Sequence, residues 1–191
     1  MLIRKAAFGD AGGIARVHIN SWLATYAGVV PDAHLRGLSV ERRSNSVKAE
    51  LTRMESGEEH GAMFVSVTDE GEVTGFIKGL ENPGDPPYNG ELCALYIDER
   101  FKRRGLGTGL TLELVKWLIE RGAKGMSCWV FEANAGARRF YERIGGMLLP
   151  GTKVFEIGGA KIRGVRYGWD NLAALADRLA PRPREQGGAS E

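Results

Sequence analysis

One stretch of the chain restricts the possible fold more than any other, because it joins a strand-forming run to a basic, glycine-rich turn. The sequence GELCALYIDERFKRRGLGTGL covers Gly90 to Leu110, with strand formers from Leu92 to Ile97 and glycines at Gly105, Gly107 and Gly109. Apolar residues recur at helical spacing after the glycines. A strand, a basic glycine loop and a helix are therefore expected in this order.

The start of the expected helix is suited to binding an anion. Its first N–H groups have no partner within the helix, and the aligned peptide dipoles leave positive charge there. Glycine lets the backbone approach a ligand closely, and Lys102, Arg103 and Arg104 add full charges. An ordinary strand-to-helix connection is the alternative. The loop lacks the Gly-Lys-Ser/Thr of a Walker motif, and Leu110 replaces the third glycine of a dinucleotide-binding fingerprint.

Length and composition indicate one soluble domain rather than a chain recognised by its bulk charge. The 191 residues are 43% hydrophobic and 26% charged, with 26 basic and 24 acidic side chains giving a net charge of +2. That balance argues against a nucleic acid partner, which usually selects a concentrated basic face. No apolar run approaches the roughly 20 residues of a membrane helix, and no signal segment is apparent. A cytoplasmic protein without a membrane partner is expected.

Cysteine and histidine usage does not suggest a metal site. Cys93 and Cys128 lie within expected strands, with no Cys or His at ligand spacing. Both are therefore expected to be small buried residues.

The remaining elements follow from hydrophobic periodicity and from turn signals. Helices are predicted from Asp10 to about Tyr26, from Pro31 through Ser39 to about Met54, from Leu106 to Gly122, from Asn134 to Gly145 and from Asp170 to about Leu179. Further strands are predicted at 2–6, 62–67, 72–80, 126–131, 153–157 and 161–169. The segment 82–89 reads as a proline-rich loop. One domain over 1–180 and a disordered tail from Pro181 to Glu191 are expected.

Two segments together resemble the GNAT N-acetyltransferase superfamily. KRRGLGTG is similar to its acyl-CoA signature, Q/R-x-x-G-x-G/A, with Lys102, Gly105 and Gly107 at the fixed positions. NAGARRFYERIGG, residues 134–146, resembles the family's second segment, in which Asn precedes a helix with Phe-Tyr before a glycine end. The resemblance covers residues 3–169, although only these two segments are specific. Lys102 departs from the usual Gln or Arg, and lysine lacks the planar fork of arginine.

The resemblance implies a single α/β (α+β) domain: a mixed, mostly antiparallel sheet of about seven strands with a splayed central pair and helices on both faces. The pantetheine arm of acetyl-CoA would enter the splay and pair with the main chain of Leu95, Tyr96 and Ile97. The residues expected to hold the pyrophosphate are Lys102, Arg103, Arg104, Gly105, Leu106, Gly107 and Thr108.

The same resemblance implies direct transfer of an acetyl group to an amine. Tyr141 occupies the position of a tyrosine that protonates the departing thiolate, and core packing is its alternative role. Glu91 is the first candidate for a base and Glu132 the second, although either could be a solvated charge at a strand end. Asn134 could contact the pantetheine, cap a helix, or do both.

The acceptor is expected to be a small-molecule or peptide amine, under a roof that includes Trp22 and Tyr26. A Trp and a Tyr at helical spacing are more often core residues, which is the alternative. Two other functions stay open: a non-catalytic acyl-CoA-binding sensor, and a nucleotide-binding oxidoreductase that would bind NAD. An exposed late hairpin could pair two chains in a homodimer.

Overall fold

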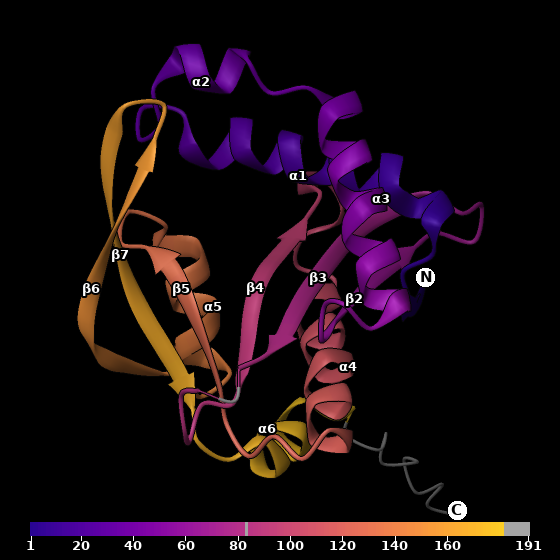
Figure 1. Cartoon of the computed structure of the whole chain (residues 1–191), viewed down its shortest axis with the longest axis vertical. Coiled ribbons are helices and arrows are strands. Elements are labelled where there is room, and N and C mark those ends of the chain that lie inside the picture. The colour runs from indigo at the N-terminus through magenta and orange to yellow at the C-terminus, as the bar shows by residue number, and fades with distance from the viewer. Residues whose placement is uncertain (83, 182–191) are drawn as a thin grey trace, which may run out of the picture.

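The strands form one mixed sheet in the computed structural model, which describes residues 1–82 and 84–181 (Figure 1). They are β1 (Leu2–Lys5), β2 (Gly61–Val67), β3 (Val73–Glu81), β4 (Gly90–Ile97), β5 (Met126–Phe131), β6 (Met147–Ile157) and β7 (Ala160–Trp169). Across the described residues the seven strands run in the order β1-β2-β3-β4-β5-β7-β6. Neighbours are antiparallel except β4 and β5, which are parallel. The mostly antiparallel sheet predicted from the sequence is confirmed.

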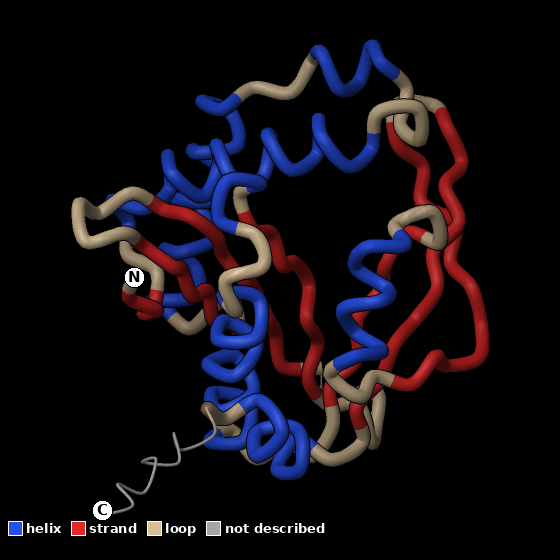
Figure 2. Tube along the Cα trace, turned by 180° about the vertical axis from the view of Figure 1, so that it is seen from behind, coloured by secondary structure: helices blue, strands red, loops and turns tan. Residues whose placement is uncertain are grey.

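Helices cover both faces of the sheet, as Figures 1 and 2 show from opposite sides. They are α1 (Ala11–Tyr26), α2 (Asp32–Arg36), α3 (Val40–Ser56), α4 (Leu106–Glu120), α5 (Ala135–Arg143) and α6 (Leu172–Leu179). Ile14 of α1 and Val47 of α3 pack with Phe76 in the core of one face. Leu110 of α4 and Tyr141 of α5 belong to the core of the other face, which α6 also joins. None of the described helices has the length and apolar character required to span a bilayer.

The helix predicted from Pro31 to Met54 is divided into α2 and α3. The break lies at Ser39, whose backbone is extended at φ −126° and whose hydroxyl accepts a hydrogen bond from the Arg42 N–H at 3.3 Å. A serine side chain bonded in this way satisfies a free donor of the following helix and favours a new start. The prediction of one continuous helix was therefore wrong.

Two predicted helix caps are also corrected. Asp10 precedes α1 as predicted, but its carboxylate accepts hydrogen bonds from the Arg4 guanidinium at 2.7 and 2.9 Å and from the Ala7 N–H at 2.7 Å, and makes no cap bond to α1. At α6 the cap is Asn171, whose side chain accepts from the Ala174 N–H at 3.0 Å. At α1 the ion pair with Arg4 occupies the Asp10 carboxylate, and at α6 the neighbouring Asn171 caps the helix in place of Asp170. Helical periodicity shows neither effect.

The outer hairpin is longer than predicted, because β6 begins at Met147 and not at Lys153. Its register against β7 shifts between Leu149 and Thr152, and this irregularity interrupts the alternation that would reveal a strand. β6 is an edge strand, and Leu148 and Val154 are each 57% exposed on it. Pairing of two chains along this edge stays a prediction.

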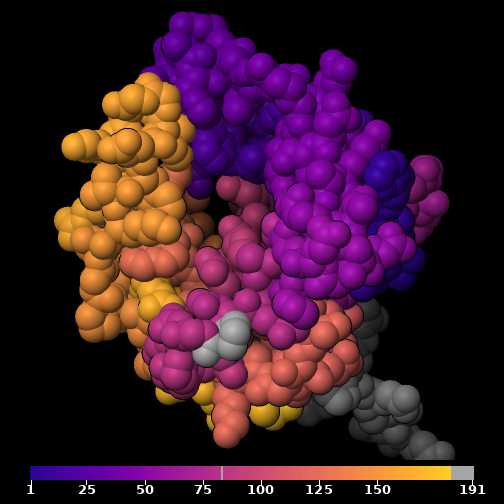
Figure 3. Space-filling model, in the orientation of Figure 1, coloured from indigo at the N-terminus to yellow at the C-terminus, as the bar shows by residue number. Residues whose placement is uncertain are grey.

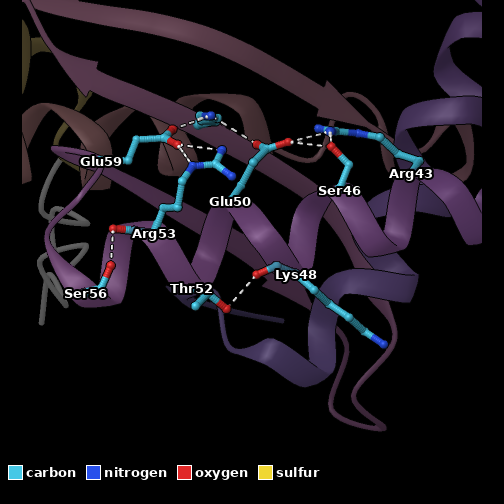
Figure 4. Close-up of polar contacts among 9 residues, drawn as sticks. Arg43, Ser46, Lys48, Glu50, Thr52, Arg53, Ser56 and Glu59 are labelled. Atoms are coloured by element: carbon cyan, nitrogen blue, oxygen red, sulfur yellow. Dashed lines mark hydrogen bonds and ion pairs between the residues drawn. The ribbon is translucent and has the colours of Figure 1, made fainter.

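A network of charged side chains joins α3 to β3 (Figure 4). Lys78 Nζ lies 3.1 Å from Glu50 and 2.6 Å from Glu59, while Arg43 and Arg53 pair with the same carboxylates at 2.6 and 2.9 Å. Burial opposes the charge of Glu50, but the guanidinium of Arg43 and the ammonium of Lys78 outweigh it and lower the pKa of this carboxyl. The network ties α3, which packs on α1 and β2, to the Lys78 side chain of β3.

Candidate active site

The central strands β4 and β5 part after two residue pairs. Gly90 pairs with Met126 and Glu91 with Ser127, and no further pair joins these strands in the described chain. The other edge of β4 stays paired with β3 as far as Ile97, and that of β5 with β7 as far as Phe131. The facing edges therefore border a slot with unpaired backbone donors and acceptors. The splayed pair predicted from the resemblance is confirmed.

A cavity of about 880 Å³ lies at this parting and reaches both faces of the sheet. Figure 3 shows the molecule hollowed between the β6–β7 hairpin and the half that contains α1 and α3. The predicted site residues that line the cavity are Trp22, Tyr26, Glu91, Leu95, Tyr96, Ile97, Lys102, Arg103, Gly105, Leu106, Gly107, Thr108, Asn134 and Tyr141. The structure thus brings together residues from α1, β4, the glycine loop and α5.

The glycine loop has the backbone geometry of an anion seat. Gly105 is left-handed at φ +79° and begins α4, and Arg103 is also left-handed at φ 61°. The first helical hydrogen bond runs from the Gly109 N–H to the Gly105 carbonyl at 3.0 Å. The N–H groups of residues 106–108 precede it and have no acceptor within the helix. They are the donors that a phosphate at this helix end would meet.

The glycines of the loop differ in what an added side chain would contact. A Cβ at Gly107 would lie 3.4 Å from the Phe140 ring inside the cavity. A Cβ at Gly109 would lie 2.5 Å from Ile3, so this glycine lets α4 approach β1 and does not serve the ligand site. The regular spacing seen in the sequence therefore does not reflect one shared requirement.

The three basic side chains before the loop also differ. Lys102 lines the cavity and forms an ion pair with Glu99. The guanidinium of Arg104 lies 5.3 Å from the centre of the Phe101 ring, and Arg104 is not one of the lining residues. Arg103 lines the cavity and has no carboxylate at ion-pair distance among the described residues. Arg103 is therefore the side chain best placed to meet an anion.

Cys93 is the unopposed residue of a β-bulge in β4. Leu92 pairs with Gly79 and Ala94 with Lys78, which leaves Cys93 without a partner. It is exposed, so the expectation that it is buried was wrong, whereas Cys128 is buried as expected. The exposed surface of Cys93 faces into the cavity, where the surrounding protein excludes much of the water and raises the thiol pKa to about 12. Cys93 is consequently a neutral thiol at physiological pH.

Tyr141 belongs both to the core and to the cavity. Its ring packs at 5.9 Å from Tyr167 and 5.7 Å from Trp169, and it is 6% exposed. Burial raises its pKa well above the ordinary value, with smaller contributions from Cys128 and neighbouring tyrosines. The hydroxyl therefore holds its proton at neutral pH and has one to donate.

Glu91 is the one carboxylate among the described residues that line the cavity. It forms the last pair between β4 and β5, opposite Ser127, and so lies where the slot opens. Glu132, the second candidate base, is paired with Arg163 at 3.6 Å and does not line the cavity. Of the two candidates, Glu91 is therefore the one at the slot.

The roof of the cavity is held by two hydrogen bonds. Trp22 Nε1 donates to the Tyr96 hydroxyl at 3.0 Å, and Asn134 Nδ2 donates to the Tyr26 hydroxyl at 3.1 Å. Asn134 Oδ1 also accepts from the N–H of residue 137 at 3.0 Å and caps α5. Asn134 thus links the cap of α5 to Tyr26, which packs against Trp22.

The analysis of the sequence missed several lining residues, and the outer strands contribute four of them with large side chains: Trp129, Phe131, Lys153 and Phe155. They come from β5 and β6, which flank β7 in the sheet. Strand alternation groups Trp129 with Phe131 and Lys153 with Phe155, but it does not show that the two pairs share a cavity with α1.

Comparison with known proteins agrees with this geometry. Residues 29–146 match the family described as the acetyltransferase (GNAT) family. YuaI, an uncharacterised N-acetyltransferase of Bacillus subtilis, is 30% identical over 178 residues, which cover 93% of this chain and 97% of YuaI. An uncharacterised N-acetyltransferase of Archaeoglobus fulgidus is 29% identical over 144 residues, which cover 74% of this chain and 89% of that protein.

Solved structures of other N-acetyltransferases share the fold. The crystal structure of the PaiA N-acetyltransferase of Thermoplasma acidophilum, in complex with coenzyme A, superposes with a TM-score of 0.66 at 22% identity. The match covers 88% of this chain and 98% of that one. Because the family match spans more than half of the chain and YuaI is similar over nearly all of it, this protein belongs to the GNAT family of N-acetyltransferases.

Proposed function

We propose that the protein transfers an acetyl group from acetyl-CoA directly to the uncharged primary amine of a small molecule or of a peptide end. The observation that carries this proposal is the parting of β4 from β5 beside the glycine loop that begins α4. An extended thioester arm fits a slot bordered by unpaired strand edges, and a pyrophosphate fits a helix N-terminus with free N–H groups.

Binding of the donor would rest mostly on the main chain. Leu95, Tyr96 and Ile97 lie on the free edge of β4 and would pair with the amide groups of the pantetheine arm. The N–H groups of residues 106–108 and the side chain of Arg103 would hold the pyrophosphate. Lys102 stands where the family signature has Gln or Arg, and its side chain is paired with Glu99. This departure matters little if backbone N–H groups hold the pyrophosphate, because they do not depend on side-chain identity.

The reaction needs two proton movements. The amine nitrogen forms a bond to the acetyl carbonyl carbon, and the bond from that carbon to the CoA sulfur breaks. The nitrogen gives up a proton, which Glu91 accepts directly or through water. The sulfur leaves with its bonding electrons and takes a proton from the Tyr141 hydroxyl. The products are an acetamide and free CoA thiol, so atoms and charges balance once Tyr141 regains the proton from Glu91 through solvent.

The protein contributes alignment, a site for negative charge and a positioned acid. Holding the amine against the thioester replaces a bimolecular encounter with a bound geometry. Free N–H groups along β4 can stabilise negative charge on the acetyl oxygen as it develops. A positioned acid typically contributes about 10²- to 10⁴-fold to the rate.

The test is replacement of the one hydroxyl that the proposal requires. Tyr141→Phe keeps the ring that packs on Tyr167 and Trp169, so it should lower kcat at least about 10²-fold while the affinity for acetyl-CoA stays within about twofold. Tyr167→Phe is the matched control. The Tyr167 hydroxyl bonds to Arg138 and Glu142, so its loss should leave turnover nearly unchanged. Equal rates in wild type and Tyr141→Phe would remove Tyr141 from the mechanism.

Donor identity can be tested separately by thermal shift. Acetyl-CoA should raise the melting temperature, because a ligand that binds only the native state stabilises it. NAD and ATP should leave the temperature unchanged, whereas stabilisation by NAD would favour an oxidoreductase instead.

A further inference from the structure

The half of the cavity on the α1 side is formed by one face of the outer strands. Val130 of β5 packs in the core shared with α4 and α5, so alternation turns its neighbours Trp129 and Phe131 to the opposite face. Phe131 pairs with Gly164 of β7, and Gly164 pairs with Lys153 of β6. Directly paired residues share a face, so Lys153 lies on the same side as Phe131 and lines the same cavity.

Four rings form a continuous aromatic wall on this face, from α1 to β6. Ring centroids are 5.2 Å apart for Trp22 and Tyr26, 5.0 Å for Tyr26 and Phe131, and 5.3 Å for Phe131 and Phe155. The indole N–H and the phenol hydroxyl of the wall are already hydrogen-bonded within the protein. An acceptor would therefore meet mainly ring surfaces, which suit a flat aromatic body.

Among the described residues, Lys153 is the one basic side chain that β5, β6 and β7 contribute to the cavity lining, and Arg166, 5.9 Å from the Trp129 ring, is paired with Asp85 instead. Lys153 Nζ lies 5.1 Å from the centre of the Phe155 ring and 6.0 Å from that of Trp129. No carboxylate of the described chain lies within ion-pair distance of it. β7 separates β6 from β5, so Lys153 starts two strand spacings, roughly 10 Å, from β5 and the slot. An anionic group that it attracts would lie beside the rings of Phe155 and Trp129.

The cavity also has few negative charges. Glu91 is the one acidic lining residue of the described chain, and it lies at the slot. A polyamine or an aminoglycoside has several ammonium groups, each of which would need a carboxylate partner. Lys153 would instead repel an ammonium group at the outer end of the wall.

We propose that the acceptor is a primary amine with an aromatic body and a carboxylate at the opposite end of that body. This proposal rests on the proposed function and narrows its acceptor. The amine lies at the slot beside Glu91, the ring lies on the aromatic wall, and the carboxylate faces Lys153. The reaction itself is unchanged: the N–H bond of the amine breaks, the acetamide bond forms and CoA thiol leaves.

The test compares two acceptors that differ in one end group, which is anionic in one and neutral in the other. 4-(2-Aminoethyl)benzoate and 4-(2-aminoethyl)benzamide share amine, ring and length, and steady-state kinetics with acetyl-CoA gives kcat/KM for each. The wild-type protein should prefer the carboxylate by about fivefold, the worth of a partly exposed charge pair near 1 kcal/mol. Lys153→Met should bring the ratio close to one, mainly through KM, and Lys153→Glu should invert it.

Lys161→Met is the matched control, because Lys161 is an exposed lysine of the same hairpin that does not line the cavity. It should keep the wild-type ratio. An unchanged ratio in Lys153→Met would overturn the role of Lys153 and leave it the ordinary role of a charge that protects an edge strand. Spermidine is the third substrate, and faster transfer to spermidine than to either ring compound would overturn the acceptor class.

These failures are distinct from a failure of the proposed function. Transfer to spermidine or to a peptide amine but not to the ring compounds would reject the acceptor class and keep the acetyl transfer. Absence of any thermal stabilisation by acetyl-CoA would reject the donor site itself.

Discussion

The side-chain amide of Asn134 donates a hydrogen bond to the Tyr26 hydroxyl at 3.1 Å, although the two residues are 108 positions apart. The same side chain caps α5 by accepting from the Ala137 N–H at 3.0 Å. One residue therefore fixes the start of the helix that bears Tyr141 and joins it to the end of α1. Both residues line the cavity, so the bond lies in its wall.

This relationship predicts energetic coupling between Tyr26 and Asn134. Tyr26→Phe should lower the free energy of unfolding by about 1 kcal/mol, and Asn134→Ala by about 2 kcal/mol because it also removes a cap. The double variant should lose less than the sum by about 1 kcal/mol. Denaturant unfolding of the four proteins measures the coupling. Asn171→Ala, which removes the cap of α6 alone, should be additive with Tyr26→Phe.

Gly105 and Gly122 form a matched pair for the anion seat. Their φ angles are +79° and +80°, and at both positions an added Cβ would meet open space. Alanine at either site should cost about 1 kcal/mol of stability, because a left-handed backbone disfavours a side chain. Only Gly105→Ala should weaken acetyl-CoA binding, since Gly122 lies beyond the far end of α4. Isothermal titration with both variants tests this, and equal affinities would argue against the loop as the pyrophosphate site.

The network in Figure 4 predicts a large cost for one neutral substitution. Glu50→Gln leaves Arg43 and Lys78 without a carboxylate that now lies 2.6 and 3.1 Å away, at sites where the side chains are 22% and 15% exposed. The free energy of unfolding should fall by about 2 kcal/mol. Glu113→Gln removes an exposed pair with Lys116 on α4 and should cost at most about 0.5 kcal/mol. Similar losses in both variants would contradict a structural role for the network.

His18 predicts a pH dependence of stability. Its ring packs at 5.0 Å from Tyr96 and 5.5 Å from Trp22, and burial, with the charge of Arg43, lowers its pKa from 6.5 to about 4. A lowered pKa means that the folded state disfavours the protonated imidazole. The free energy of unfolding therefore has its full value, as far as His18 is concerned, above pH 6.5. It falls as the pH drops toward 4, by up to about 1.4 kcal/mol per pH unit.

The measurement is denaturant unfolding at pH 7, 6 and 5. His18→Gln should show a smaller fall in stability across this range than the wild type. The carboxylates of the network have lowered pKa values and titrate mainly at lower pH, so they do not obscure the effect. His60→Gln, at an exposed position, should keep the wild-type slope. A wild-type slope in His18→Gln would assign the acid sensitivity to other groups.

Local patterns in the sequence were sufficient for the elements whose signals lie within one segment. The strand before Gly105, the helix after it and the cap at Asn134 depend on neighbours a few residues away, and each forms as predicted. The failures arose where a local signal had a competitor. Ser39 ended a helical pattern with a new cap, and the irregular register of β6 concealed its first half.

The sequence by itself thus determined the order of elements, the loop chemistry and the position of Tyr141 on its helix. Tertiary structure alone decided how far β4 and β5 stay paired, that the bulge turns Cys93 into the cavity, that Arg104 lies on Phe101, and that Lys153 faces Trp22 and Tyr26 across one space. The physical reason is that strand register and side-chain face are set by pairing with distant residues. A shift of one residue turns every following side chain to the other face, and no local periodicity records where that shift occurs.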